Sequence, residues 1–223
     1  GVQTCALPIS VDRRFARPRQ KLVEVLREKG INDERVLMAI GKIPRHTLID
    51  SGLHHKAYDD TALPIGMGQT ISQPYTVAKQ TELLELERGN KILEIGTGSS
   101  YQSMVLCEMG AKLYSVERHS ELYHQAKKAL QEQGYRAMLK AGDGTLGWST
   151  YAPYDGIIVT AGAPVVPQDL IAQLNVGGKL VIPVGDDKKQ MMLRITRVSD
   201  TEYHQEEFDN FKFVPLIGEK GWK

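Results

Sequence analysis

One pattern limits the possible folds of this 223-residue chain more than any other: beyond about residue 90, strand-type and helix-type segments alternate. Short runs rich in Ile, Leu and Val are separated by stretches with apolar residues at helical spacing. Strands that alternate with helices pair in parallel through right-handed crossovers. We therefore predict an α/β fold with a doubly wound, mainly parallel sheet. The expected strands are 91–95, 112–116, 136–140, 156–159 and 179–184, the expected helices are 101–109, 120–133 and 167–174, and 191–198 and 211–215 are expected edge strands whose direction is left open.

The first part of the chain is organised differently. Apolar spacing predicts one helix that ends at Gly30 and a second that runs from about Asp33 to just before Pro44. Segment 51–75 then loses periodicity and collects glycines and prolines, and helical spacing resumes over 77–86. Irregular segments of that length inside a compact domain are usually functional. We expect an N-terminal helical cap followed by an active-site loop.

Composition excludes several classes of protein. The chain carries 28 Lys and Arg against 27 Asp and Glu, a formal net charge of +1, and is 41% hydrophobic. This balance argues against a dedicated nucleic-acid binder, and the absence of a long apolar run argues against a membrane protein. Cys5 and Cys107 are too few for a disulfide framework or a Cys-rich zinc site. We expect a cytoplasmic monomer without a metal.

The expected domain organisation is simple. Residues 1–10 lack an initiator Met and the apolar stretch of a signal peptide, so we expect a non-native or disordered leader. Residues 11–223 are expected to form one domain, because the sequence contains no interdomain linker. Within it, 11–88 would form the cap and active-site loop, and 89–223 the α/β ligand-binding core.

A glycine loop follows the first expected strand. Gly96 and Gly98 allow a tight turn and a close approach of backbone to a ligand. A dinucleotide fingerprint would need a third glycine at the position of Tyr101. Glu94, just before the loop, would repel a pyrophosphate and suits a cationic ligand. S-adenosylmethionine, which has a sulfonium and an ammonium but no phosphate, fits this loop.

Two further acids end the next two strands. Glu117 lies 21 residues after Gly96, where a carboxylate can accept both ribose hydroxyls of an adenosyl group. Asp143 ends the third strand and is placed to accept from the adenine amino group. Each acid alone could be a solvated strand end, but three in register with the carboxyl edge of the sheet favour a binding crevice.

The irregular segment contains a cluster of hydroxyl and amide side chains at Gln69, Thr70 and Ser72. Such a run can fold over the cofactor and donate hydrogen bonds to an anion. A simple helix start, with Ser72 as N-cap and Pro74 near the first position, explains only the end of the segment. Both roles can coexist.

With these motifs, the chain resembles the protein-L-isoaspartate O-methyltransferases, a family of class I S-adenosylmethionine-dependent methyltransferases, over about residues 19–216. The run from Gly68 to Pro74 is the most restrictive part of the match. Other parts of the match are 43–46, 63–67, 93–102, 116–118, 142–144, 152–155, 157–160, 177–185 and 213–216. The resemblance implies catalytic Ser72 and Thr70, a cofactor site of Glu94, Gly96, Thr97, Gly98, Ser99, Glu117, Asp143 and Gly144, and substrate contacts from Gln69, Ile71, Val214 and Pro215.

The implied reaction transfers a methyl group to the free α-carboxylate of an isoaspartyl residue in a damaged protein or peptide. The resulting ester closes to a succinimide, which starts repair. Because a free α-carboxyl group has a pKa of about 3.5–4, it is already ionised at neutral pH and needs no general base. Ser72 and Thr70 would orient it. The chain departs from the family in having Ser100 where glycine is usual, which would strain the loop if that residue needs a positive φ.

Two alternatives stay open: a related methyltransferase acting on RNA or a small molecule, and a catalytically weakened homologue that still binds the cofactor. Other residues favour structural roles. We expect His46, His54 and His55 to be exposed rather than metal ligands, and Cys107 to be a small buried hydrophobe. The pairs 186–187 and 188–189 predict a mixed-charge hairpin turn. Segment 211–216 either packs at the sheet edge or borders a peptide groove.

Overall fold

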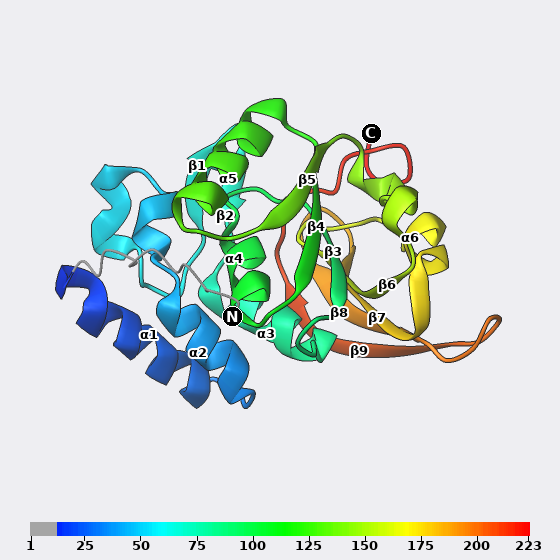
Figure 1. Ribbon diagram of the computed structural model, residues 1–223, viewed down its shortest axis with the longest axis horizontal. Helices are drawn as coiled ribbons and strands as arrows, with labels where there is room; N and C mark the ends of the chain where they lie inside the picture. The colour runs from blue at the N-terminus through cyan, green and yellow to red at the C-terminus, as the bar shows by residue number, and fades with distance from the viewer. Residues whose placement is uncertain (1–12) are drawn as a thin grey trace, which may run out of the picture.

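A seven-stranded sheet organises the molecule, and the computed structural model describes residues 13–223 (Figure 1). The strand order is β5-β4-β3-β6-β7-β8-β9; the first five pair in parallel and the last two add antiparallel neighbours. The chain leaves β3 first towards β4 and β5 and later crosses to β6, so the crevice at the carboxyl ends of β3 and β6 is the expected ligand site. The strands are β3 (Lys91–Ile95), β4 (Lys112–Glu117), β5 (Ala137–Ala141), β6 (Tyr154–Val159), β7 (Leu174–Gly185), β8 (Gln190–Arg197) and β9 (Tyr203–Phe211).

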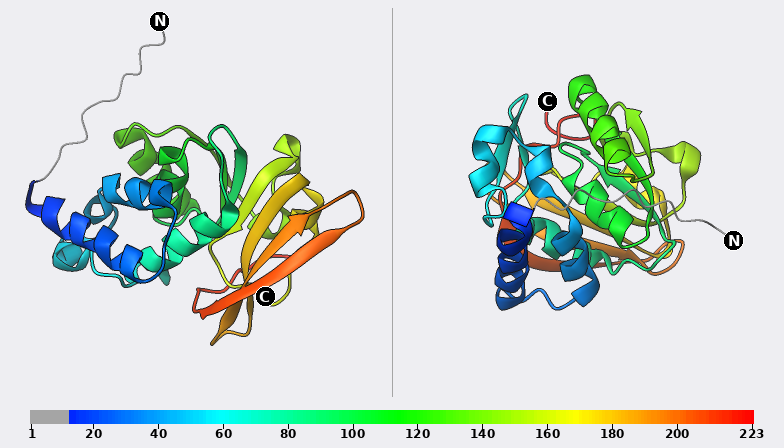
Figure 2. Two further views of the ribbon diagram at one scale, coloured as in Figure 1. Left: turned by 90° about the horizontal axis from the view of Figure 1, so that it is seen from below. Right: turned by 60° about the vertical axis from the view of Figure 1, so that its left-hand side comes forward.

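Helices cover the sheet and build the cap. Figures 1 and 2 place the cap at one end of the molecule and the turn between β8 and β9 towards the other. Asp33 begins the second cap helix by accepting a hydrogen bond from the Arg35 backbone N–H, a common N-cap arrangement. The helices are α1 (Ala16–Glu28), α2 (Glu34–Lys42), α3 (Pro74–Leu84), α4 (Tyr101–Glu108), α5 (Ser120–Glu132) and α6 (Gln168–Ala172), with 3₁₀ turns at Arg13–Phe15, Arg45–Leu48, Ser51–Lys56, Gly144–Leu146 and Ser149–Tyr151.

The cap helices share one buried hydrophobic cluster with helices that cover the sheet. Leu26, Leu37 and Ile40 from the cap helices pack in the same buried cluster as Met104 and Val105 from α4. All five side chains are almost completely inaccessible to solvent. The cap is therefore held against the α/β core by apolar packing. Leu63 and Ile71, in the segment between cap and core, pack in the same cluster.

The predicted fold class is confirmed, while three local predictions are wrong. The segment expected to be irregular contains a hairpin, β1 (Leu63–Gly66) with β2 (Gln69–Ile71). The last edge strand, β9, begins at Tyr203, eight residues before the expected start at 211. The sequence did not indicate this start because a mostly polar edge strand shows little apolar periodicity. The N-cap of α3 is Gln73, not Ser72, with Pro74 as the first helical residue.

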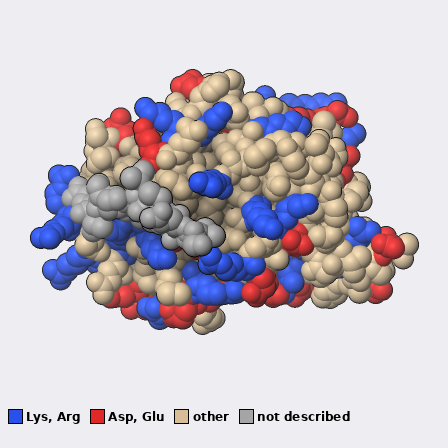
Figure 3. All heavy atoms as spheres, viewed as in Figure 1, with Lys and Arg blue, Asp and Glu red and all other residues tan. Residues whose placement is uncertain are grey.

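The remaining overall features concern surface and termini. Basic and acidic side chains are interspersed over most of the face in Figure 3, in keeping with the formal charge of +1. None of the helices between residues 13 and 223 has the length and apolar character needed to cross a bilayer. The predicted leader, residues 1–10, lies outside the described residues.

Candidate active site

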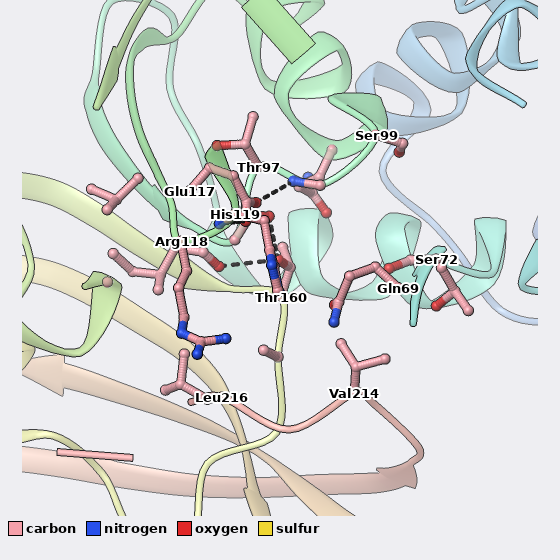
Figure 4. A pocket seen from close by; sticks show the side chains of 18 of the residues that line it. Gln69, Ser72, Thr97, Ser99, Glu117, Arg118, His119, Thr160, Val214 and Leu216 are labelled. Carbon is pink, nitrogen blue, oxygen red and sulfur yellow. Dashed lines mark hydrogen bonds between the residues drawn. The ribbon is translucent and has the colours of Figure 1, made fainter. Parts of the chain in front are cut away.

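A cavity opens at the carboxyl edge of the sheet, at the crevice expected from the strand order (Figure 4). Thr97 and Glu117 lie on one side, Gln69 and Ser72 on another, and Val214 approaches from the C-terminal segment. The lining comprises Gln69, Thr70, Ser72 and Val77, then Ile95 to Ser99, Tyr101, Gln102, Val116 to His119, Gly144, Thr160, Ala161 and Val214 to Ile217.

The glycine loop after β3 is closed by contacts that admit no side chain at its first glycine. The Gly96 N–H donates to the Val116 carbonyl at 2.9 Å, and its φ is +94°. A Cβ on Gly96 would lie 2.5 Å from Oγ1 of Thr160, which itself donates to the Gly96 carbonyl at 2.6 Å. Gly98 has a φ of +50°. The nearest atom to a Cβ placed on Gly98 would be Cδ1 of Ile65, 4.0 Å away, so the backbone there faces open space.

Glu117 holds this loop from the end of β4. Its Oε2 accepts from the Gly98 N–H and its Oε1 from the His119 N–H, both at 2.8 Å. The side chain is only 4% exposed, yet it lines the cavity. Each carboxylate oxygen keeps a further lone pair. Glu117 can therefore fix the loop and still accept from a ligand's hydroxyl groups.

Thr70 and Ser72 come from the β1–β2 hairpin and the residue after it. Both line the cavity, and both also line a second, neighbouring groove. Thr160 and Val214 are shared in the same way. The groove continues along Ala62, Gln73, Tyr75, Thr76, Lys188, Lys189 and Asn210 to Phe213. These four shared side chains mark the place where two ligands, one in each hollow, would meet.

Comparison with known proteins identifies the family. Residues 17–221 match the model of the family described as Protein-L-isoaspartate(D-aspartate) O-methyltransferase (PCMT). The chain belongs to the PCMT family. It is similar to the Protein-L-isoaspartate O-methyltransferases of Cytophaga hutchinsonii, at 56% identity over 92% of each chain, and of Christiangramia forsetii, at 58% identity over 91% of this chain and 95% of that one.

Solved structures agree with the fold. A protein-L-isoaspartate O-methyltransferase superposes with a TM-score of 0.83 and 28% identity, over 91% of this chain and 67% of that one. A putative enzyme of the same name from Plasmodium falciparum, in complex with S-adenosyl-L-homocysteine, has a TM-score of 0.78 at 23% identity, over 89% of this chain and 98% of that one. The family and fold predicted from the sequence are both confirmed.

The cavity fits S-adenosylmethionine, the methyl donor of this family. Gly98 presents open backbone and Glu117 offers acceptor lone pairs, and among the described residues Arg118 is the one lysine or arginine that lines the cavity. This combination of open backbone and a hydrogen-bond acceptor suits an adenosyl group without phosphates. The predicted residues Gly96, Thr97, Gly98, Ser99, Glu117 and Gly144 all line the cavity.

Glu94 does not line the cavity, which corrects its predicted contact with the ligand. Its carboxylate is completely buried beneath the loop, and its Oε2 accepts from the Ser103 and Ser115 hydroxyls at 2.5 and 2.7 Å. The Ser115 hydroxyl lies 2.6 Å from that of Thr97, so the network reaches the loop from below. Burial raises the pKa of Glu94 to about 8. Side chains alternate across a strand, and this one faces α4 rather than the ligand.

Asp143 is not among the residues that line the cavity, although its neighbour Gly144 is, and its contact with adenine stays a prediction. Its Oδ1 accepts from the N–H and hydroxyl of Thr145, and its Oδ2 accepts from the Glu219 N–H at 2.7 Å. Partial burial alone would raise its pKa, but these hydrogen bonds together outweigh burial and hold the pKa below the ordinary value. Asp143 therefore anchors the C-terminal segment, whose residues Leu216 and Ile217 do line the cavity.

Ile71 is the one predicted substrate contact that points away from both hollows. Its side chain is fully buried in the cap cluster, where it contributes about 2 kcal/mol of apolar burial. The alternation of side chains in β2 places Thr70 and Ser72 on the opposite side. Gln69, Val214 and Pro215 line the cavity, and their contact with a substrate stays a prediction.

Arg118, His119 and Thr160 stand out among the cavity residues that were missed. All three follow closely after the end of a predicted strand. Position after a strand end is the signal that pointed to Glu117, and it could have indicated these residues too. Figure 4 shows the Arg118 side chain extending from the Glu117 side towards the C-terminal segment. Thr160 is the most consequential, because it supports the glycine loop and also faces the groove.

The remaining side predictions have mixed outcomes. His46 is buried rather than exposed: its Nδ1 lies 2.7 Å from the Tyr58 hydroxyl, and its ring stacks on Phe15. Residues 13–223 contain no cluster of three or more His, Cys, Asp or Glu suited to a metal. Burial raises the pKa of Cys107 to about 12, which keeps its thiol neutral. The mixed-charge turn is confirmed, since Asp186 accepts from the backbone N–H groups of residues 188 and 189.

Proposed function

We propose that this chain methylates the free α-carboxylate of L-isoaspartyl residues in damaged proteins and peptides, with S-adenosylmethionine as donor, and so starts repair through a succinimide. Membership of the PCMT family, and identities above 50% to enzymes of this name across nearly the whole chain, support the reaction. The observation that carries the site assignment is the set of side chains shared between cavity and groove.

The arrangement divides the two ligands between the two hollows. Bound S-adenosylmethionine supplies an electrophilic methyl group on a sulfonium. Glu117 and the backbone of Gly96 to Ser99 would hold the adenosyl and amino-acid parts in the cavity, with Glu94 supporting the loop from beneath. The peptide would lie in the groove alongside Tyr75 and Phe211, whose rings stack on each other with centroids 6.3 Å apart in its wall.

Ser72 and Thr70 would orient the isoaspartyl carboxylate at the junction. A hydroxyl donates one neutral hydrogen bond, which aligns an anion without quenching its nucleophilicity as a buried cation would. With an ordinary pKa of about 3.5–4 the carboxylate arrives ionised, so positioning and exclusion of water are what the chain must provide. Val214, Pro215 and Leu216 supply apolar surface at this point.

The test uses labelled S-adenosylmethionine and two peptides that differ only in an isoaspartyl or a normal aspartyl residue. We expect transfer to the isoaspartyl peptide alone. Equal transfer to both, or transfer to RNA in place of peptide, would defeat the proposal. Binding of S-adenosylhomocysteine by calorimetry with no transfer to either peptide would identify a weakened homologue instead.

Ser72→Ala tests the role of the hydroxyl. We predict a fall in kcat/KM of about 10- to 100-fold, because one neutral hydrogen bond to an anion is worth roughly 1.5–3 kcal/mol. The affinity for S-adenosylhomocysteine should stay within about threefold. The control is Ser51→Ala at the exposed start of a 3₁₀ turn, which should leave both values unchanged. Undiminished turnover in Ser72→Ala would remove Ser72 from the mechanism.

A further inference from the structure

Arg45 is a completely buried cation that neither the family reaction nor the cofactor site uses. Its side chain has no exposed surface, and none of the residues in the range 13–223 forms a salt bridge with it. Burial lowers the pKa of its guanidinium from the ordinary value. Buried charges without a carboxylate partner are costly and rare, so this position calls for a specific explanation.

The guanidinium is held by backbone carbonyls instead. Nη1 donates to the Ala57 carbonyl at 2.6 Å, and Nη2 donates to the carbonyls of Thr61 at 2.9 Å and Ser72 at 3.1 Å. Thr61 and Ser72 flank the β1–β2 hairpin on its two sides. A single nitrogen of Arg45 therefore joins both ends of the hairpin at its base.

This hairpin needs support from outside itself. Two strands alone are marginally stable, and here the pairing carries a register irregularity between Pro64 and Gly66. The tip is exposed, with Met67 at 51% accessibility and a φ of +52°. Apolar burial of Leu63 and Ile71 holds one side of the base, and Arg45 holds the backbone of the other.

Arg45 also contacts the cofactor side of the site. Its Cζ lies 5.3 Å from the centre of the Tyr101 ring, within cation–π range. Tyr101 begins α4 directly after the glycine loop and lines the cofactor cavity. One side chain thus connects the carbonyl of Ser72 to the element that ends the cofactor loop.

We propose that Arg45 is a positioning residue that fixes the Ser72 segment against the cofactor loop by clamping the base of the hairpin. It touches neither ligand and acts through the backbone of Ser72. Arginine suits this position because its donors lie on two separate terminal nitrogens of a rigid planar fork, whereas the three donors of lysine all lie on one atom. The inference rests on the proposed function, since it takes the Ser72 segment as the carboxylate-orienting element.

The experiment compares Arg45→Met and Arg45→Lys with Arg194→Met. Arg194 is also mostly buried, but it pairs with Glu85 at the end of α3 and with Glu206 of β9, and it lines neither hollow. All variants are assayed at a temperature at which circular dichroism shows them folded. Isoaspartyl-peptide kinetics, S-adenosylhomocysteine affinity and amide hydrogen exchange are measured on each.

We expect kcat/KM per folded molecule to fall by about 30- to 100-fold in Arg45→Met and about tenfold in Arg45→Lys, while cofactor-product affinity stays within about threefold. Amide exchange over 63–72 should accelerate at least about tenfold in both variants and remain as in the wild type in Arg194→Met. Arg194→Met should lose thermal stability and keep its kcat/KM.

Three outcomes overturn the inference: unchanged kcat/KM in both Arg45 variants, exchange that accelerates uniformly across the chain, or failure of both variants to fold while Arg194→Met folds. The last outcome would assign Arg45 to the overall fold. The wild-type arm separates the two proposals: if wild type transfers no methyl group, the proposed function fails, while the exchange data still decide whether Arg45 clamps the hairpin.

Discussion

Ser100 occupies a backbone conformation that favours glycine. Its φ is +66°, its side chain is buried, and its hydroxyl donates to the Ser99 carbonyl without capping α4. For a residue with a Cβ this region costs about 1–2 kcal/mol. The positive φ on which the expected strain depended is present, so Ser100 carries that strain.

We predict that Ser100→Gly raises the free energy of unfolding by about 1 kcal/mol and Tm by about 2–4 °C, because the strain is removed. Urea unfolding and a thermal scan measure this. Ser100→Ala is the matched control: it loses the hydroxyl but keeps the Cβ, so no gain is expected. A Gly variant no more stable than the Ala variant would show that the loop tolerates the serine without cost.

Glu94 gives stability a pH dependence with a definite sign. Its pKa rises from an ordinary 4.5 to about 8 in the folded chain, because burial penalises the charged form. Between these values the folded state binds a proton that the unfolded state releases. Stability therefore falls as pH rises from about 4.5 to about 8, and this contribution is constant above that range.

Glu94→Gln should remove this dependence. We predict that wild type loses stability relative to the variant by about 1 kcal/mol per pH unit between pH 5 and 8, measured by urea unfolding at several pH values. Glu132→Gln, whose side chain is 61% exposed on α5, is the control and should track wild type. Parallel pH profiles for wild type and Glu94→Gln would contradict the assignment.

Sequence reasoning at this scale succeeds where the spacing itself dictates position. Gly96, Gly98 and Glu117 follow strand ends that meet at one sheet edge, and they line the cavity together. It fails for Glu94 because local spacing does not report which face of a strand end meets the ligand. Sequence reasoning also does not predict the role of Arg45, because no local pattern indicates that a charged side chain will be buried against backbone carbonyls.

At the scale of elements, the C-terminal segment forms one wall of the cavity and is held by hydrogen bonds to Asp143 and to the backbone of Gly162. Asp143 accepts from the Glu219 N–H, and the indole of Trp222 donates to the Gly162 carbonyl at 3.1 Å. The Leu216 N–H also donates to the Gly162 carbonyl, at 2.8 Å, beside a parallel bridge between Gly162 and Pro215. The wall is therefore built from sequence far from the glycine loop.

We predict that Asp143→Ala raises amide exchange over 216–223 at least about tenfold and weakens S-adenosylhomocysteine binding about three- to tenfold, because it removes a charge-assisted hydrogen bond. Exchange mass spectrometry and calorimetry measure the two effects. Asp200→Ala, at a turn residue whose side chain is 90% exposed, should change neither. Unchanged exchange would mean that the contacts with Gly162 and Thr145 hold the segment without Asp143.

Elements were predictable in proportion to their burial. The central strands β3, β4 and β6 are apolar and lie within a residue or two of their predicted bounds. The hairpin β1–β2 and the edge strand β9 were missed, because short or edge strands are defined by tertiary pairing rather than by an apolar run.

At the scale of the whole molecule, the division into cap and core proposed from sequence describes chain order rather than independent units. Leu130 of α5, together with residues of α4, belongs to the same buried cluster as the cap helices. The strand–helix alternation was enough to predict a parallel sheet, since few other arrangements satisfy it. The position of the hairpin over the sheet edge depends on this shared packing and could not be inferred from any local pattern.

The double membership of Thr70, Ser72, Thr160 and Val214 limits how this enzyme can be re-engineered. Under the proposed division of the two ligands, a substitution at any of them would alter the surroundings of the methyl donor and of the acceptor at once, so neither affinity could be adjusted independently. Tyr75 and Phe211, by contrast, line the groove but not the cavity. Attempts to broaden the range of accepted polypeptides should begin with these two rings.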